Sequence, residues 1–193
     1  MKLTSRLALF ASGSGSNAEV IIRHFKNHPQ IEVALVLTNN ATAGVIERAQ
    51  KLDVQTKFFT REQFRESEPI LQLLREYEIT HIVLAGFLLQ IPTSLIQEYP
   101  SRIINIHPSL LPKFGGKGMY GMKVHEAVKQ SGETETGITI HEVNEHYDDG
   151  RVLFQAKCKV EATDTPEQIA RNVQALEHHH FPLVIEKWIL STK

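Results

Sequence analysis

The chain has 193 residues, which suits one domain that buries a substantial core without disulfide bonds. Its 21 lysines and arginines nearly balance its 22 aspartates and glutamates, so charge gives no reason to expect a nucleic acid or a membrane as a partner. A single cysteine, Cys158, excludes an internal disulfide and a paired thiolate metal site, and the first apolar run is too short for a membrane span or a signal peptide. We expect a cytoplasmic protein that acts on small molecules.

Apolar runs rich in β-branched residues alternate with helical patterns over the first half of the chain. Strands are expected at 6–11, 31–38, 54–59, 81–88 and 101–107. Helices are expected from about Asn17, over 44–52 and over 61–78, the last with a kink or junction near Pro69. Because the strands carry few charges, the pattern predicts a Rossmann-like α/β fold, with a mainly parallel sheet covered by helices on both faces.

The second half of the chain changes character. Segments 135–143 and 150–160 alternate apolar and polar residues around a turn-like stretch, which predicts an antiparallel strand pair at a sheet edge. A helix over 165–190 follows, with Thr165 as its cap and Pro166 at its first position. Since no repeat or linker divides the sequence, we expect a single domain over 1–193.

A glycine-rich loop joins the first strand to the first helix. Gly13, Gly15 and Ala18 match the G-x-G-x-x-G/A spacing of a dinucleotide-binding loop. A second interpretation is a site for one phosphate, formed at the helix N-terminus by the backbone N–H groups of Gly15, Ser16 and Asn17. A plain tight turn is the third.

The end of the second strand separates these interpretations. A dinucleotide site needs an acidic residue there for the ribose hydroxyls, or an arginine for a 2′-phosphate. The sequence instead has Thr38, Asn39 and Asn40. The absence of both residue types weakens the case for NAD and favours a single phosphate.

The fifth strand ends in two polar residues, Asn105 and His107, which strand alternation places on one face. The carboxyl end of a strand in an open α/β sheet is where ligands bind. An asparagine amide can donate to a developing oxyanion and a histidine can exchange a proton, so the pair suits attack on a carbonyl group. Simple capping of the strand is the alternative, although Pro108 and Pro112 restrict the following loop against the expected pocket.

A carboxylate near His107 would orient the imidazole and raise its pKa. Asp148 and Asp149 are the candidates, and either is equally suited to a turn before Gly150. Spacing alone does not choose between them.

Ordered motifs along nearly the whole chain resemble the folate-dependent phosphoribosylglycinamide formyltransferases of purine synthesis. The matching stretches are SGSGSN at 12–17, VLAGF at 83–87, NIHPSLLPK at 105–113, DDGRVLFQAK at 148–157, VQALEH at 173–178 and FPLVI at 181–185. The resemblance implies a formyltransferase fold with a phosphate-binding half, about 1–100, and a catalytic and folate-binding half, about 101–193.

The resemblance also implies a reaction and its partners. The amine of glycinamide ribonucleotide would attack the formyl carbon of 10-formyltetrahydrofolate, without a metal, in a monomer or homodimer. Asn105 would hydrogen-bond the oxyanion, His107 would stabilise charge or transfer a proton, and Asp148 would hold His107 in its charged form. Asp149 replaces a glycine that is usual in the family.

By the same resemblance, the two substrates would occupy different segments. The residues implied for glycinamide ribonucleotide are Gly15, Ser16 and Asn17 at the phosphate, Pro108, and Gln174 and Glu177 at the ribose and amine. The residues implied for the folate are Leu88, Leu89, Gln90, Ile91 and Asn105, with Arg61 at its glutamate tail. The chain differs from the family at Leu89, where arginine is common, and in the stretch KFGGKGMYG at 113–121.

Several alternatives are less consistent with the sequence. Methionyl-tRNA formyltransferase and formyltetrahydrofolate deformylase share the core, but the resemblance implies an added domain in each. A dehydrogenase is disfavoured by residues 38–40, and a non-catalytic nucleotide-binding module is the remaining alternative. The histidines at 178–180 point about 100° apart on a helix, so we expect no metal site there.

Overall fold

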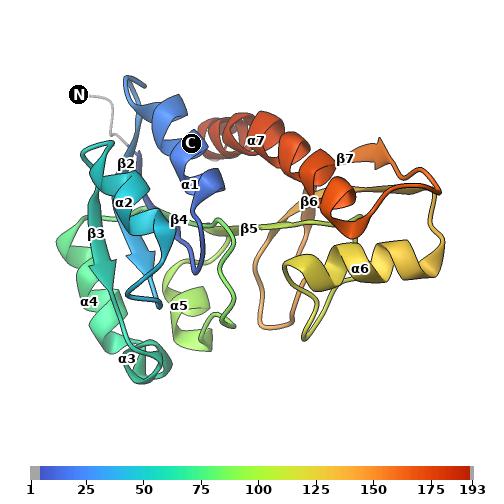
Figure 1. Ribbon diagram of the computed structural model, residues 1–193. Helices are drawn as coiled ribbons and strands as arrows, with labels where there is room; N and C mark the ends of the chain where they lie inside the picture. The colour runs from blue at the N-terminus through green and yellow to red at the C-terminus, as the bar shows by residue number, and fades with distance from the viewer. Residues whose placement is uncertain (1–4, 192–193) are drawn as a thin grey trace.

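The structure is a computed structural model, and it describes residues 5–191. One sheet runs through the molecule with strand order β3-β2-β1-β4-β5-β6-β7 (Figure 1). The strands are β1 (Ser5–Phe10), β2 (Ile31–Thr38), β3 (Gln55–Phe58), β4 (His81–Leu84), β5 (Ile103–His107), β6 (Glu135–Glu142) and β7 (Val152–Lys159). The first five pair in parallel, and β6 and β7 extend the sheet antiparallel at one edge, which confirms the expected α/β architecture.

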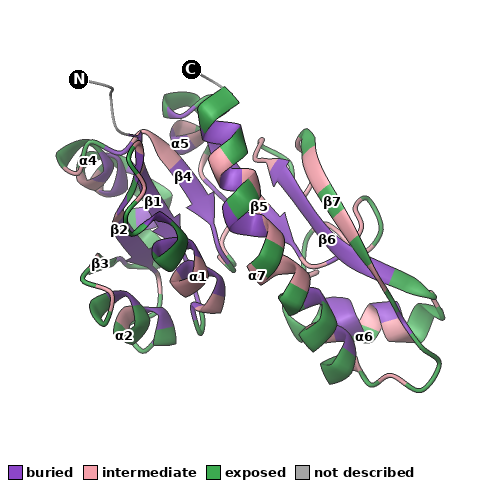
Figure 2. Ribbon diagram, turned by 90° about the horizontal axis from the view of Figure 1, so that it is seen from above, coloured by how far each residue is buried: buried purple, intermediate pink, exposed green. Residues whose placement is uncertain are grey.

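Helices cover both faces of this sheet. They are α1 (Ser16–Phe25), α2 (Gly44–Gln50), α3 (Arg61–Glu66), α4 (Glu68–Glu76), α5 (Thr93–Glu98), α6 (Met122–Ser131) and α7 (Pro166–Ser191). Strand alternation directs Leu7 and Leu9 into a core with α1, α2, α6 and α7, and Ala8 and Phe10 into a second core with α3, α4 and α5. Figure 2 shows the strands β4, β5 and β6 mostly buried, and helix α7, which packs against β6 and β7, with exposed residues along its outer side.

The junction expected near Pro69 divides the segment 61–78 into α3 and α4, where Ser67 has a positive φ of 63° and Pro69 lies in the first turn of α4. The structure differs from the sequence prediction in three other elements. The strand expected over 81–88 ends at Leu84, and the chain leaves the sheet at Gly86, which has a φ of 75°. The short helices α5 and α6 were not predicted.

Among residues 5–191, none of the helices combines the length and the apolar character that crossing a bilayer requires.

The N-terminus of α7 carries the cap that the sequence predicted, and it offers a test of the fold. The Thr165 hydroxyl accepts from the Gln168 N–H at 3.3 Å, and the Gln168 side chain accepts from the Thr165 N–H at 2.7 Å. Thr165→Ala removes this reciprocal pair, so urea unfolding should show a loss of about 1 kcal/mol. Thr163→Ala, at an exposed turn position, should stay within about 0.5 kcal/mol of wild type. Equal losses in both variants would contradict the cap.

Candidate active site

Three loops with polar side chains meet at one edge of the sheet. They follow β1, β4 and β5, which are adjacent and parallel, so their carboxyl ends lie at the same edge. The order places β1 beside both β2 and β4, the reversal point at which α/β sheets bind ligands. Ser12 joins two of the loops, because its N–H donates to the Gly86 carbonyl at 3.1 Å and its hydroxyl accepts from the Leu88 N–H at 3.1 Å.

The glycine loop after β1 is held in a conformation that needs glycine. Gly15 precedes α1 with a φ of 77°, and a Cβ there would lie 2.5 Å from the Cβ of Val45. Within residues 5–191, no side chain caps the N-terminus of α1. The first-turn N–H groups and the helix dipole therefore form a site with the electrostatics of an anion-binding loop.

Helix α7 lies over this loop and brings two expected residues to it. The Gln174 amide donates to the Ser16 hydroxyl at 3.1 Å, and the Asn17 amide donates to the Glu177 carboxylate at 2.7 Å. Burial raises the pKa of Glu177, and the hydrogen bond from Asn17 opposes that shift only in part. Glu177 is therefore a carboxyl group whose charged form lacks a cationic partner among the described residues.

The end of β5 meets the turn before β7, and the structure selects Asp148 over Asp149. Asp148 Oδ2 lies 3.5 Å from His107 Nδ1 and accepts from the Gly116 N–H at 2.9 Å. The other ring nitrogen of His107, Nε2, donates to the Phe114 carbonyl at 2.7 Å. Asp149 is exposed, whereas the Asp148 side chain is only 12% exposed.

The protonation of this pair bears on one expectation. Asp148 acts to raise the pKa of His107, but burial outweighs it and the net pKa lies below the ordinary value. Burial therefore works against the charged form expected for His107, because the ring is only 4% exposed. Burial also opposes ionisation of Asp148, but its contacts with His141, His107 and the Gly116 N–H outweigh burial and lower its pKa.

His141 is a site residue that sequence reasoning missed. It lies directly opposite Asn105 in the antiparallel β5–β6 pair, with its Nε2 at 3.1 Å from Asn105 Nδ2 and 3.6 Å from Asp148 Oδ1. Its Nδ1 lies 2.8 Å from the Glu142 carbonyl, which makes Nδ1 the donor and leaves Nε2 to accept from Asn105. The alternating stretch ITIHEV at 138–143 contains His141, but only the strand register reveals its contact with Asn105.

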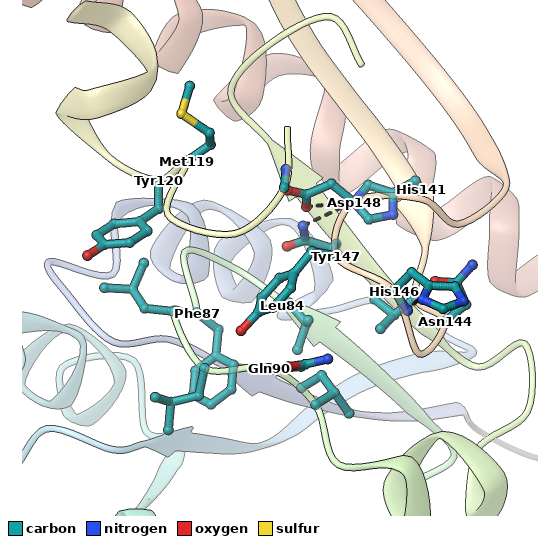
Figure 3. A pocket seen from close by; sticks show the side chains of 16 residues that line it. Leu84, Phe87, Gln90, Met119, Tyr120, His141, Asn144, His146, Tyr147 and Asp148 are labelled. Atoms are coloured by element: carbon teal, nitrogen blue, oxygen red, sulfur yellow. Dashed lines mark hydrogen bonds and ion pairs between the residues drawn. The ribbon is translucent and has the colours of Figure 1, made fainter. Parts of the chain in front are cut away.

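A cavity of about 90 Å³ opens between these groups and the loop after β4 (Figure 3). Its walls include five of the six residues expected at the folate, Leu88 to Ile91 and Asn105, together with His141 and Asp148. Tyr120 and Tyr147, both more than 40% exposed, stand at its mouth. Two expected residues, His107 and Pro108, are not among the described residues that line it, and His107 reaches the cavity only through Asp148.

The loop after β4 is anchored in the core by Phe87. Its ring makes edge contacts with Phe10 and with Phe64, each at 5.3 Å between centroids. Across the cavity, the Gln90 amide donates to the Glu145 carbonyl at 3.2 Å. Arg61 lies outside this cavity, in a neighbouring hollow of about 370 Å³ that shares the loop residues 89–91.

The histidines of α7 form no metal site with their neighbours. Over residues 5–191, no three His, Cys, Asp or Glu side chains come together in a group able to hold a metal ion.

Comparisons with known proteins agree with this fold. The family model described as formyl transferase matches residues 5–185, and the chain belongs to that family. A phosphoribosylglycinamide formyltransferase of Bacillus subtilis is 35% identical over 187 residues, covering 94% of this chain and 93% of that protein. The crystal structure of a phosphoribosylglycinamide formyltransferase from Bacillus halodurans is 35% identical, with a TM-score of 0.88 over 98% of this chain and 97% of that one.

Plant relatives are more similar in sequence but longer. The chloroplastic phosphoribosylglycinamide formyltransferase of Arabidopsis thaliana is 41% identical over 186 residues, which are 93% of this chain and 64% of that protein. The Vigna unguiculata enzyme is also 41% identical, and the match covers 60% of its length. The chain thus spans a little under two thirds of these plant proteins. The resemblance expected from the sequence is confirmed at the level of the family.

The buried His107–Asp148 pair gives a prediction for proton binding. The imidazole of His107 should titrate below its ordinary pKa of 6.5, and Asp148→Asn should lower that pKa further, because it removes the charge that favours the imidazolium. NMR titration of the histidine ring nitrogens measures both, with Asp149→Asn as the matched control that leaves the midpoint unchanged. A higher midpoint in Asp148→Asn would contradict the pairing.

The same shift links pH to stability. Since the folded pKa of His107 is depressed, the unfolded chain takes up the proton first as the pH falls. The contribution of the neutral ring is present above the ordinary pKa of 6.5 and is lost as the pH falls from there towards the folded value.

Proposed function

We propose that this protein transfers the formyl group of 10-formyltetrahydrofolate to the amine of glycinamide ribonucleotide, giving formylglycinamide ribonucleotide and tetrahydrofolate. One observation carries the proposal: an anion-binding loop, a buried carboxyl group and an Asn–Asp–His group lie at one edge of the sheet. These are the three features that a phosphorylated amine needs to meet an acyl donor. The names of the relatives agree with this reaction.

The glycine loop and α7 suit the ribonucleotide. The N–H groups of Gly15, Ser16 and Asn17 would bind its phosphate, since they begin α1 without a capping side chain among the described residues. Gln174 would contact the ribose. The substrate amine then has Glu177 as its counter-ion, because a buried carboxyl group with a raised pKa gains most from a cation nearby.

The chemical step follows from the groups at the cavity. The amine nitrogen forms a bond to the formyl carbon while the carbonyl electron pair moves onto oxygen. Asn105 has a second amide hydrogen besides the one shared with His141, and it would donate that hydrogen to the oxyanion. His141 fixes the amide in this orientation by accepting the first hydrogen.

Asp148 and His107 would then handle the proton. The proton lost by the attacking nitrogen passes to Asp148, which faces the cavity, and His107 Nδ1 lies behind it with a free lone pair to share the charge. As the intermediate collapses, the oxyanion electron pair re-forms the carbonyl, the bond from the formyl carbon to N10 breaks with its electron pair going to N10, and N10 takes the proton held by Asp148 and His107. The neutral resting form of His107 suits this role as acceptor.

The folate would lie in the cavity beside the loop after β4. Leu88 to Ile91 line it, with Leu89 in place of the arginine usual in the family, so contact there is apolar or through the backbone. Arg61, in the adjacent hollow, is placed to meet the glutamate tail of a folate that extends past this loop. Pro108 would act on the substrate side only by fixing the chain after His107. A cytoplasmic monomer or homodimer remains the prediction for the whole protein.

A differential assay tests the reaction. Absorbance is followed on mixing the protein with 10-formyltetrahydrofolate and glycinamide ribonucleotide, and each substrate is omitted in turn. Turnover should require both. Turnover without the amine would indicate a hydrolase, and no turnover in the full mixture would contradict the proposal.

The role of Asp148 has a sharper test. Asp148→Asn should lower kcat about 100-fold or more with little change in either KM, because Asp148 accepts the proton only as the transition state forms. Asp149→Asn changes the adjacent, exposed residue in the same way and should stay within about twofold of wild type. A rise in KM alone for Asp148→Asn would show that Asp148 binds substrate without acting in the chemistry.

A further inference from the structure

We propose that Arg48, on α2, is a positioning residue that sets the direction of the loop N–H groups that bind the phosphate. The identity of the phosphorylated ligand rests on the proposed function, but the structural case rests on contacts between α2 and the glycine loop. Arg48 touches no part of the catalytic cavity, and sequence reasoning assigned it no role.

The start of α2 contacts three consecutive residues of the glycine loop. The Val45 N–H donates to the Gly13 carbonyl at 3.2 Å, and Arg48 Nε donates to the Ser14 carbonyl at 2.9 Å. The Gly15 backbone packs against the Val45 side chain so closely that no Cβ fits between them. Helix α2 therefore fixes the backbone of the glycine loop at these three residues.

These carbonyl contacts determine where the loop N–H groups point. A peptide unit is planar and trans, so its C=O and its N–H point in opposite directions. Holding the Ser14 carbonyl towards Arg48 therefore turns the Gly15 N–H away from α2. Gly15 is the first of the three proposed phosphate donors, so the Arg48 hydrogen bond orients a group that binds substrate.

The close packing of Gly44 also fixes the position of the Ser14 carbonyl group. Gly44 begins α2, and a Cβ added to it would lie 3.1 Å from the Ser14 carbonyl oxygen, closer than such contacts normally come. The Ser14 carbonyl thus lies directly on the backbone of α2, within reach of Arg48 from the next turn. A residue larger than glycine at position 44 would therefore press on the Ser14 carbonyl oxygen.

Arg48 also engages the one acidic side chain in the first turn of α1. It pairs with Glu19, which Arg23 contacts as well at 2.8 Å, and hydrogen bonds from both arginines lower the pKa of that carboxyl. A free carboxylate at this helix terminus would compete with a phosphate for the same dipole. Arg23 shares the contact with Glu19 but has no contact with the loop, which makes it a matched control.

The test compares two arginines that share one partner. Arg48→Met should raise the Kd for ribose 5-phosphate and the KM for glycinamide ribonucleotide about tenfold, as expected for loss of one charge-assisted hydrogen bond. The kcat and the KM for the formyl-folate should stay within about twofold, because the cavity is untouched. Arg23→Met should leave all four values within about twofold of wild type. Unchanged ribose 5-phosphate affinity in Arg48→Met would overturn the proposal.

A double variant separates loop positioning from charge neutralisation. In Arg48→Met with Glu19→Gln, no free carboxylate remains, yet the Ser14 carbonyl still lacks its donor. The affinity for ribose 5-phosphate should remain weak, and a return to the wild-type value would overturn loop positioning. If Arg48→Met does not fold, Arg48→Lys replaces it, since lysine keeps the charge but lacks the fork that contacts Ser14 and Glu19 together. Wild-type affinity in Arg48→Lys would also overturn the proposal.

The binding measurement is independent of the reaction. Wild-type protein that binds ribose 5-phosphate but transfers no formyl group contradicts the proposed function, while the variants still decide the role of Arg48. Wild-type protein that binds no ribose 5-phosphate overturns the Arg48 proposal directly.

Discussion

The parallel pairing of β1, β4 and β5 is the constraint on which the site depends. Parallel neighbours end at the same edge, so the loops that follow them are brought together although they begin at residues 11, 85 and 108. The antiparallel return of β6 then places His141 beside Asn105, and the turn that follows brings Asp148 to His107. Both hydrophobic cores support this arrangement, because each strand sends alternate side chains to opposite faces.

Burial disfavours the charged form of two site residues, Glu177 beside the glycine loop and His107 at the end of β5, and so shifts their pKa values in opposite directions. At one end it raises the pKa of Glu177, which favours a protonated carboxyl until a cation arrives. At the other it lowers the pKa of His107 against the pull of Asp148, which keeps the imidazole neutral. Both shifts reduce the charge that these two residues carry in the free protein, and under the proposed function they would prepare Glu177 for the substrate amine and His107 for a transferred proton.

Features that depend on local sequence pattern could be predicted, whereas features that depend on strand register or on burial could not. Runs of β-branched residues located the strands, and alternation placed Asn105 and His107 on one face. Choosing Asp148 over Asp149 from the residues alone required the distance from Asp148 to His107, and the contact of His141 required the β5–β6 register. The sequence shows a carboxylate that favours the imidazolium of His107 but not the burial that opposes it, so the direction of the pKa shift could not be predicted.

Helix α7 has a consequence for how the protein is made. Its residues Gln174 and Glu177 complete a site whose glycine loop begins at Gly13, so the site joins residues separated by most of the chain. Synthesis proceeds from the N-terminus, and the loop therefore leaves the ribosome long before α7 exists. Under the proposed function, a growing chain could not hold the ribonucleotide with its full set of contacts, and tight binding of that ligand would be a property of the finished molecule alone.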